Sequence, residues 1–452
     1  MKPSLLAAAV LVAILIAIYG PGIGKGFVKD DVVWVGNNHV TSWADVRALL
    51  VRTDGFYRPL VAATFAIDRA IYGVEPFGFG VTNLILLLLG AATLTYLGTT
   101  LGLRATTAVI GAGVWALNFH AVNMAVLWLS GRTALCVVIA ALLAAALVVT
   151  RQPIAAGVAA LLAMLAKEEA VMLPVILSGW AWFLARADYQ RERGRLGDVS
   201  RLTWPTWSAV ALYLALRAQT TAMTPMTATA SYRFVLAPGA LVANALEYLD
   251  RACTFSVIVV IVAHLIAWRR PAMTAGVRRM LILGAIWFVG TFALTIFVPN
   301  RSSLYALLPS IAPALVAGLL LQQLWDESSQ QTGTSGRTRP TQRLVVAAVA
   351  LPLLLLPVYW IRNVRWTEIA ELSTDTFAVI RRVARERPDV GLLVFRDDPS
   401  TRRSFANTYD ELLPVAVRLA AGRAIQGQLE TTDTTTPGAV HIVLKGRTVL
   451  VE

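Results

Sequence analysis

Long apolar stretches separated by short polar ones run through most of the chain. Stretches such as Val81–Leu101 and Leu344–Tyr359 approach or exceed the roughly 18 residues that a helix needs to cross the hydrocarbon core of a membrane. We therefore expect an α-helical polytopic membrane protein with about eleven transmembrane helices. These helices are expected to begin near residues 4, 79, 103, 122, 152, 169, 203, 240, 280, 304 and 344.

The polar stretch between the first two apolar runs is long, from about Pro21 to Gly78, and carries charges of both signs. Within it, apolar residues recur at helical spacing over Trp43–Leu50 and again over Leu60–Ile71. This pattern predicts two amphipathic helices that lie along the membrane surface. Residues 21–78 are accordingly expected to form a large first extracytoplasmic loop.

The composition changes after Trp360. The pattern predicts a helix over residues 367–387, a buried strand over 390–395, a helix over 408–421, and a hairpin of residues 440–444 and 448–451. We therefore expect a transmembrane catalytic domain over residues 1–362 and a small extracytoplasmic α/β domain over residues 363–452. A polar low-complexity linker is expected over residues 328–341.

Composition and charge support the membrane assignment. The chain is 57% hydrophobic and 15% charged, whereas soluble domains average about a quarter charged residues. The net charge of +13 does not form one stripe, so no nucleic-acid partner is expected. Basic residues instead cluster in short loops, which predicts that these loops and the amino terminus are cytoplasmic and that the C-terminal domain is periplasmic, in an inner membrane. The clustered residues are Arg186, Arg191, Arg193, Arg195, Arg201, Arg269, Arg270, Arg278, Arg279, Arg337, Arg339 and Arg343.

Several polar clusters fall at the outer ends of the expected helices. In Lys29-Asp30-Asp31 a carboxylate is suited to take a proton from a hydroxyl or to hold a cation, although a solvated loop would look the same. In Tyr57-Arg58 the arginine can bind a phosphate in a bidentate manner, and a structural pair with Asp54 or Asp68 is an equal alternative.

Three further clusters have the same position. Asn118, His120 and Asn123 precede Arg132, and an arginine inside a membrane helix usually has a function, whereas a single histidine is more often structural. Lys167-Glu168-Glu169 either cap two helices or bind an anionic head group. Asn300-Arg301 can neutralise the phosphate of a lipid. Glu247 and Arg251 suggest an internal pair, and Asp397-Asp398 a turn.

Taken in order, these clusters resemble the GT-C superfamily of membrane glycosyltransferases, and most of all its TMTC-type branch of O-mannosyltransferase relatives. The resemblance covers about residues 1–370. No tetratricopeptide repeats follow, and the α/β domain stands in their place. The residues that carry the resemblance are Phe27-Val28-Lys29-Asp30-Asp31 with Asn37, Tyr57-Arg58-Pro59-Leu60, Phe119-His120 through Gly131-Arg132, Lys167-Glu168, Arg301 with Tyr305 and Pro309-Ser310, and Arg362-Asn363 with Trp366 and Glu368.

The resemblance implies transfer of one sugar, mannose above all, from a polyprenyl-phosphate donor to a hydroxyl on a protein, lipid or glycan acceptor at the outer face of the bilayer. It implies inversion, with Asp31 as general base assisted by Asp30. The donor phosphate would be bound by Arg58, Lys167 and Arg301. Substrate would be positioned by Tyr57, His120, Asn123, Arg132 and Glu168. No cofactor and no metal are predicted, although some relatives use a divalent metal.

Two other functions fit part of the pattern. A transporter or flippase for a lipid-linked saccharide would also need an outer anionic site, but it should have polar or broken helices near the midplane and often an inverted repeat. A membrane scaffold protein would use the loops for packing and the α/β domain for partners. The separate acidic and basic clusters at one face favour the enzyme.

Overall fold

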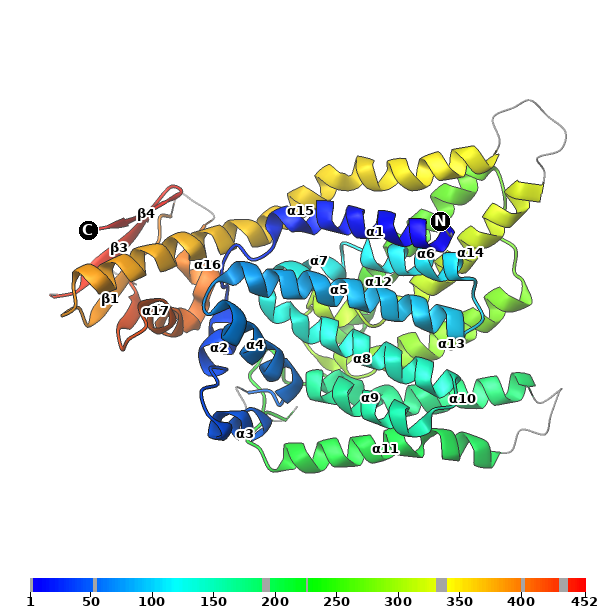
Figure 1. The fold of residues 1–452 in the computed structure, drawn as a ribbon, viewed down its shortest axis with the longest axis horizontal. Coiled ribbons are helices and arrows are strands. Elements are labelled where there is room, and N and C mark those ends of the chain that lie inside the picture. Colours follow the sequence, from blue (N-terminus) through cyan, green and yellow to red (C-terminus); the bar gives the residue numbers. More distant parts are fainter. Residues whose placement is uncertain are drawn as a thin grey trace.

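A computed structural model describes residues 3–51, 55–188, 196–224, 227–330, 340–399, 403–430 and 438–452. Residues 331–339 of the predicted linker (328–341) and the basic residues at 191, 193, 195, 337 and 339 lie outside the described residues, whereas residues 328–330 and 340–341 belong to helices. The chain is mostly helical, with one small sheet (Figure 1). The helices are α1 Pro3–Tyr19, α2 Asp31–Asn37, α3 Trp43–Val51, α4 Pro59–Tyr72, α5 Pro76–Thr100, α6 Ala105–Ala116, α7 Val122–Leu127, α8 Arg132–Val149, α9 Pro153–Ala166, α10 Leu173–Asp188, α11 Leu196–Ala218, α12 Pro238–Ala267, α13 Ala275–Phe292, α14 Ile311–Gln330, α15 Pro340–Glu386, α16 Phe405–Tyr409 and α17 Leu413–Ala421.

Several helices begin at a proline, which has no amide hydrogen to lose in the first turn and a backbone angle already suited to a helix. Pro59, Pro76, Pro153 and Pro238 occupy this position in α4, α5, α9 and α12. Among the described residues, six helical segments are long and apolar enough to cross a membrane, and α6 and α9 are shorter apolar helices. The total of about eleven spans stays a prediction.

The helices pack side by side in a bundle (Figure 1). Helix α8 lies between α5 and α9, and α9 in turn packs on α11. On the other side, α5 packs on α6, and α6 packs on α14, which also contacts α12 and α13. A short 3-10 turn, η2 (Leu129–Gly131), separates α7 from α8. The predicted fourth span is therefore broken near its N-terminal end.

The described residues of the predicted first outer loop (21–51 and 55–78) contain the short helices α2, α3 and α4, at the end of the bundle that faces the C-terminal domain (Figure 1). The two predicted amphipathic helices are confirmed as helices α3 and α4. Helix α2 was not predicted, because its seven residues are too few to display a period. Close backbone packing holds the start of this loop, since a Cβ at Gly26 would meet the carbonyl oxygen of Ala370 at 2.0 Å.

The C-terminal part is built on α15, a 47-residue helix that runs along the bundle and out into a small domain (Figure 1). The predicted domain boundary at residues 362 and 363 falls inside this helix. The sheet has the order β2-β1-β3-β4, with β1 parallel to both neighbours and β3 antiparallel to β4. The strands are β1 Leu392–Arg396, β2 Gln426–Leu429, β3 Val440–Lys445 and β4 Thr448–Val451.

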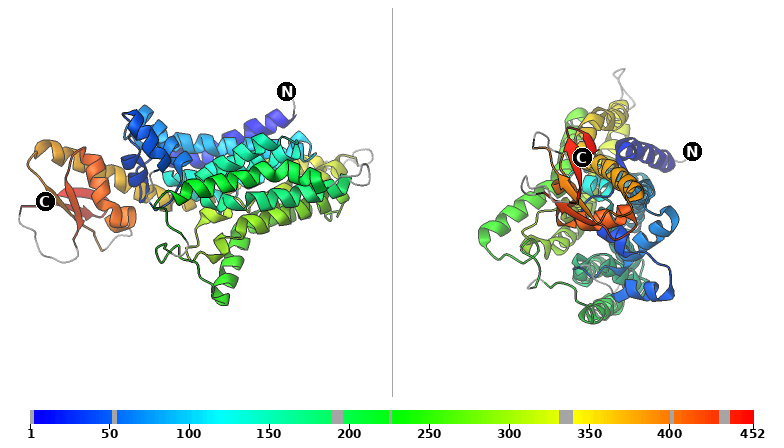
Figure 2. Two further views of the ribbon diagram at one scale, coloured as in Figure 1. Left: turned by 90° about the horizontal axis from the view of Figure 1, so that it is seen from below. Right: turned by 90° about the vertical axis from the view of Figure 1, so that its left-hand side faces the viewer.

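The C-terminal domain is joined to the first outer loop as well as to α15. Helix α17 packs on α15, on β2 and on α2 of the loop. In the views of Figure 2 the domain caps one end of the bundle. The domain and the loop therefore meet at the place where the outer polar clusters were expected.

Candidate functional site

A polar cavity of about 540 Å³ lies where the bundle, the first outer loop and the C-terminal domain meet. Its walls come from the segment that leads into α2, the start of α4, the broken region of α7 and η2, the region of the 3-10 turn η5 (Ser303–Ala306), and α15. Basic side chains dominate this lining, which suits an anionic ligand. The acidic lining residues are Asp30 and Asp410, and the basic ones are Lys29, Arg58, Lys167, Arg251, Arg301, Arg362 and Arg365.

The segment of residues 27–29 presents Asp30 to the cavity, and three contacts from distant elements hold it. The carbonyl groups of residues 27 and 28 accept hydrogen bonds from Ser373 Oγ (2.6 Å) and Trp128 Nε1 (3.1 Å). The amide of residue 29 donates to the carbonyl of Thr408 in the C-terminal domain (2.8 Å). The bundle, α15 and the C-terminal domain thus fix this segment jointly.

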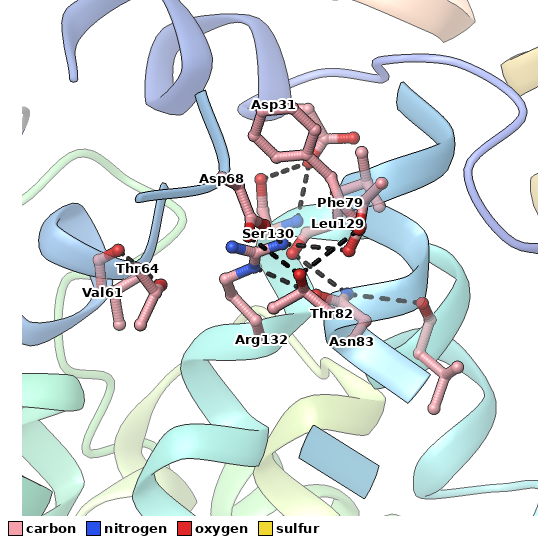
Figure 3. A network of polar contacts seen from close by, with 12 residues as sticks. Asp31, Val61, Thr64, Asp68, Phe79, Thr82, Asn83, Leu129, Ser130 and Arg132 are labelled. Carbon is pink, nitrogen blue, oxygen red and sulfur yellow. Dashed lines mark hydrogen bonds and ion pairs between the residues drawn. The ribbon is translucent and has the colours of Figure 1, made fainter. Parts of the chain in front are cut away.

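The two adjacent aspartates have different environments. Asp31 is 1% exposed and does not line the cavity. Its Oδ2 accepts from the amide of Val28 (2.9 Å), and its Oδ1 accepts from the amide of Ser130 (2.7 Å) and from the Ser130 hydroxyl (Figure 3). Burial raises the pKa of Asp31 to about 7, against the lowering effect of these hydrogen bonds. Asp31 therefore ties the first outer loop to the break in the fourth span.

Asp30 is open to the cavity. The enclosing protein atoms raise the pKa of its carboxyl above the ordinary value, and the charge of Asp410 adds to that rise. Arg58 and Lys29 act in the opposite direction. A carboxylate with a raised pKa that faces a cavity is a suitable proton acceptor.

Arg58 lines the cavity and is held by Glu168, which lies outside the lining. Its Nη2 and Nε donate to the two carboxylate oxygens of Glu168 at 2.6 and 2.9 Å, and its guanidinium lies 4.1 Å from the ring centre of Phe56. Of the two partners considered from the sequence, Asp68 pairs elsewhere and Asp54 lies outside the described residues.

The other two predicted phosphate ligands also line the cavity, and each has a carboxylate partner. Lys167 pairs with Glu169 at 3.0 Å, and its ammonium lies 4.4 Å from the ring centre of Tyr305. Arg301 pairs with Glu247 at 3.1 Å. The structure thus brings the three predicted cations to one cavity and orients each with a glutamate.

The predicted positioning residues differ in their access to the cavity. Asn123 lines it and hydrogen-bonds Asn363. Tyr57 is 2% exposed and does not line it. His120 also lies outside the lining and packs on Phe119, with ring centres 4.6 Å apart.

Arg132 is enclosed in the bundle and does not line the cavity. Its guanidinium lies 2.7 Å from Asp68, and it donates to Asn83 Oδ1 and to the carbonyl of Phe79, both at 3.0 Å (Figure 3). Asn83 in turn donates to backbone carbonyls of α7 and η2. This network stabilises the break that carries the Asp31 contact.

Some lining residues were not predicted as site residues. Arg362 and Arg365 lie one turn apart on α15, and within the described part of the chain neither has a carboxylate or hydrogen-bond partner. Tyr232 comes from the segment between α11 and α12, and Asp410 from the C-terminal domain. For Asp410 the sequence carries no signal, because its place in the site depends on how the domain docks.

An apolar pocket of about 320 Å³ borders the polar cavity and shares Phe56, Tyr232 and Tyr305 with it. A separate apolar groove of about 440 Å³ lies between α12, α13 and α14. The polar cavity and the apolar pocket therefore lie on opposite sides of shared aromatic residues.

Within the described residues, no group of three or more His, Cys, Asp or Glu side chains could hold a metal ion. Two carboxylates line the cavity, which is fewer ligands than a protein-bound divalent cation usually has. Catalysis without a metal stays a prediction.

The chain is an integral membrane protein, and its fold is similar to the folds of the two solved structures described below. The predicted class, a helical polytopic membrane protein with a small C-terminal α/β domain, is confirmed. No family model and no curated protein matches the sequence.

Two solved structures have a fold similar to that of this chain. ArnT from Cupriavidus metallidurans, bound to undecaprenyl phosphate, has a TM-score of 0.53 and 12% identity over 94% of this chain and 86% of that chain. The archaeal oligosaccharyltransferase AglB from Archaeoglobus fulgidus, in complex with an inhibitory peptide and a dolichol-phosphate, has a TM-score of 0.51 and 11% identity. That match covers 94% of this chain and 64% of AglB. At such identities the likeness defines the fold and assigns no residue.

Proposed function

We propose that the protein transfers one sugar from a polyprenyl-phosphate donor to an acceptor hydroxyl at the outer face of the membrane, with inversion. The observation that carries this proposal is a carboxylate, Asp30, facing a set of basic side chains in a cavity that borders an apolar pocket. The basic side chains would bind the donor phosphate, the apolar pocket would hold the lipid chain, and Asp30 would accept the proton. The motif order favours a TMTC-like enzyme and mannose as the sugar.

We place the general base at Asp30, in preference to Asp31. Both oxygens of Asp31 already accept hydrogen bonds, and its side chain is closed off from the cavity. In the reaction Asp30 would take the proton of the acceptor hydroxyl as that oxygen bonds to the anomeric carbon. The bond from the anomeric carbon to the phosphate oxygen breaks at the same time, and its electron pair leaves on the lipid phosphate.

The leaving phosphate needs positive charge. Arg58 and Lys167 lie beside the apolar pocket, so a donor with its chain in that pocket would place its phosphate between them and Arg301. Glutamates pair with all three, and each pairing orients a cation that still has free hydrogen-bond donors. Arg362 and Arg365 supply further charge that no carboxylate of the described residues neutralises.

The remaining predicted residues would act in three ways. Asn123 faces the cavity and would contact the sugar. Glu168 would orient Arg58, and Arg132 would stabilise the broken helix. Tyr57 and His120 would shape the walls from behind. This proposal takes residues 1–362 as the transmembrane domain, with the amino terminus cytoplasmic and the C-terminal domain periplasmic.

The test is donor turnover by the full chain in lipid nanodiscs, with radiolabelled polyprenyl-phosphate mannose and membrane extract as acceptor. We expect wild type to release the label from the lipid and Asp30→Asn to lose about 100-fold or more of that activity. Asp31→Asn is the matched control at the neighbouring residue, and its activity per folded molecule should equal that of wild type. Full activity of Asp30→Asn would refute the assignment of the base.

A transporter or a scaffold gives different results in the same system. A flippase would move intact donor across the bilayer without consuming it, and a scaffold would do neither. If the wild type consumes no donor with several sugars and instead translocates them, the glycosyltransferase proposal is wrong.

A further inference from the structure

Two residues in the lining of the polar cavity have an unusual backbone. Lys29 and Asp410 have φ angles of +52° and +53°, a region that residues with a Cβ rarely adopt. Asp410 combines this with ψ of −138°, a conformation that is essentially restricted to glycine. Among the described residues only Arg151 and Trp268 share a positive φ without being glycine. Half of the strained positions in the described chain therefore lie at this one cavity.

The two strained residues belong to the same contact between the C-terminal domain and the first outer loop. The amide of Lys29 donates to the carbonyl of Thr408, two residues before Asp410. Between them, Tyr409 is fully buried and its hydroxyl donates to Ser373 Oγ on α15 (3.0 Å). The contacts of the two residues that precede Asp410 thus help to maintain its backbone conformation. Strain that the surroundings maintain in this way is characteristic of functional positions.

We propose that Asp410 is a positioning residue of the transferase site, through which the C-terminal domain binds the acceptor and directs its reacting hydroxyl toward Asp30. The inference rests on the proposed function and extends it to the domain, for which the sequence indicates no chemistry. Asp30 and Asp410 are the two acidic groups among the lining residues, and the other charged groups of that lining are basic. The phosphate of the donor will occupy the basic walls, so the carboxylates remain for a ligand that donates hydrogen bonds, such as a polyhydroxyl acceptor.

The proximity of the two carboxylates has a second effect. The charge of Asp410 raises the pKa of Asp30, which makes Asp30 a stronger proton acceptor once it is ionised. Neutralising Asp410 should therefore lower the pKa of Asp30 and move the acid limb of the activity profile to lower pH. A residue whose charge does not act on Asp30 would not produce this shift.

A glycine substitution separates the backbone conformation at position 410 from the chemistry of the Asp410 carboxylate. Glycine adopts the observed φ and ψ without strain, so Asp410→Gly should fold at least as stably as wild type. It removes the carboxylate, however, and should lose transfer activity. Asp410→Asn keeps a hydrogen-bonding side chain without the charge, and Glu411→Gln is a control that alters the exposed neighbouring carboxylate.

The experiment measures donor turnover, acceptor KM, the pH profile and thermal unfolding for these full-length variants in nanodiscs. We expect Asp410→Gly to have an unchanged or raised Tm, a transfer rate lowered by at least about tenfold, and an unchanged donor KM. Asp410→Asn should keep part of the rate and shift the acid limb to lower pH. Glu411→Gln should match wild type.

The outcomes distinguish this inference from the proposed function. An active wild type together with a fully active Asp410→Gly and an unshifted pH profile overturns the role of Asp410 alone. A raised donor KM in Asp410→Gly, with acceptor KM unchanged, also overturns it. A wild type that consumes no donor refutes the proposed function and this inference with it.

Discussion

Removing one member of the buried Arg132–Asp68 pair should lower the free energy of unfolding much more than removing one member of an exposed ion pair does. The side chains of Arg132 and Asp68 are 0% and 5% exposed, and their charged groups are 2.7 Å apart. Asp68→Asn keeps the shape of the side chain and its acceptor for Thr82, but leaves the guanidinium without its counter-charge. The cost of an uncompensated buried charge is about 3–5 kcal/mol.

The double variant Arg132→Met with Asp68→Leu removes both charges. It leaves Asn83 Oδ1 and the carbonyl of Phe79 each without one donor, which costs about 1–3 kcal/mol per group. The single variants Arg132→Met and Asp68→Leu each leave one buried charge without its partner, which the double variant avoids. The double variant should therefore be less destabilised than the sum of these two single variants, with a coupling free energy of about 2 kcal/mol or more.

The assay is thermal unfolding in lipid nanodiscs combined with donor turnover per folded molecule. The matched control is Arg104→Met, which removes half of the more exposed Arg104–Asp326 pair, whose charged groups are 2.8 Å apart, and should cost no more than about 1 kcal/mol. If Arg132→Met is as stable as wild type yet inactive, the reasoning fails, because Arg132 would then act on substrate as the sequence suggested.

Three further predictions follow from the titratable and basic residues. Because the pKa of Asp31 in the folded protein, about 7, is above its ordinary value of 3.8, ionisation opposes folding, so wild-type stability should fall as pH rises from about 4 through 7. Asp31→Asn should lack that fall in a denaturation series against pH. Arg362→Gln with Arg365→Gln should raise donor KM about tenfold without lowering Tm, whereas Arg382→Gln on the same helix should change neither. Turnover should rise with pH through the raised pKa of Asp30, and a rate that falls over that range would contradict its role as base.

Five of the ten site residues expected from the sequence line the polar cavity, namely Asp30, Arg58, Asn123, Lys167 and Arg301. Such residues are noticeable in a sequence because polar side chains at the ends of apolar helices are costly. The resemblance made Asp31 the general base with Asp30 assisting, whereas Asp30 is the aspartate that faces the cavity. Which aspartate faces the cavity depends on Ser130, 99 residues away, which binds Asp31 and leaves Asp30 free. Arg132 was recognised as unusual inside an apolar stretch, but its partner Asp68 comes from another helix, so its structural role was not visible.

The fold was predictable where a pattern is long and periodic. The amphipathic helices α3 and α4 and the hairpin of β3 and β4 were expected at nearly the observed residues. Strand β2 was missed because its sequence, Gln-Gly-Gln-Leu, has almost no apolar residue, and it pairs with β1 through its backbone. The change of composition near residue 362 marks no helix end, since α15 continues through it.

The central claim is that the polar cavity is where a lipid-linked sugar reacts. Electron cryo-microscopy of the full chain in nanodiscs with undecaprenyl phosphate tests this most directly, because it locates both ends of the lipid. The account predicts phosphate density between Arg58, Lys167 and Arg301, with the lipid chain entering the apolar pocket beside Tyr232. Phosphate density outside the polar cavity, or a lipid bound only in the groove between α12, α13 and α14, would contradict it.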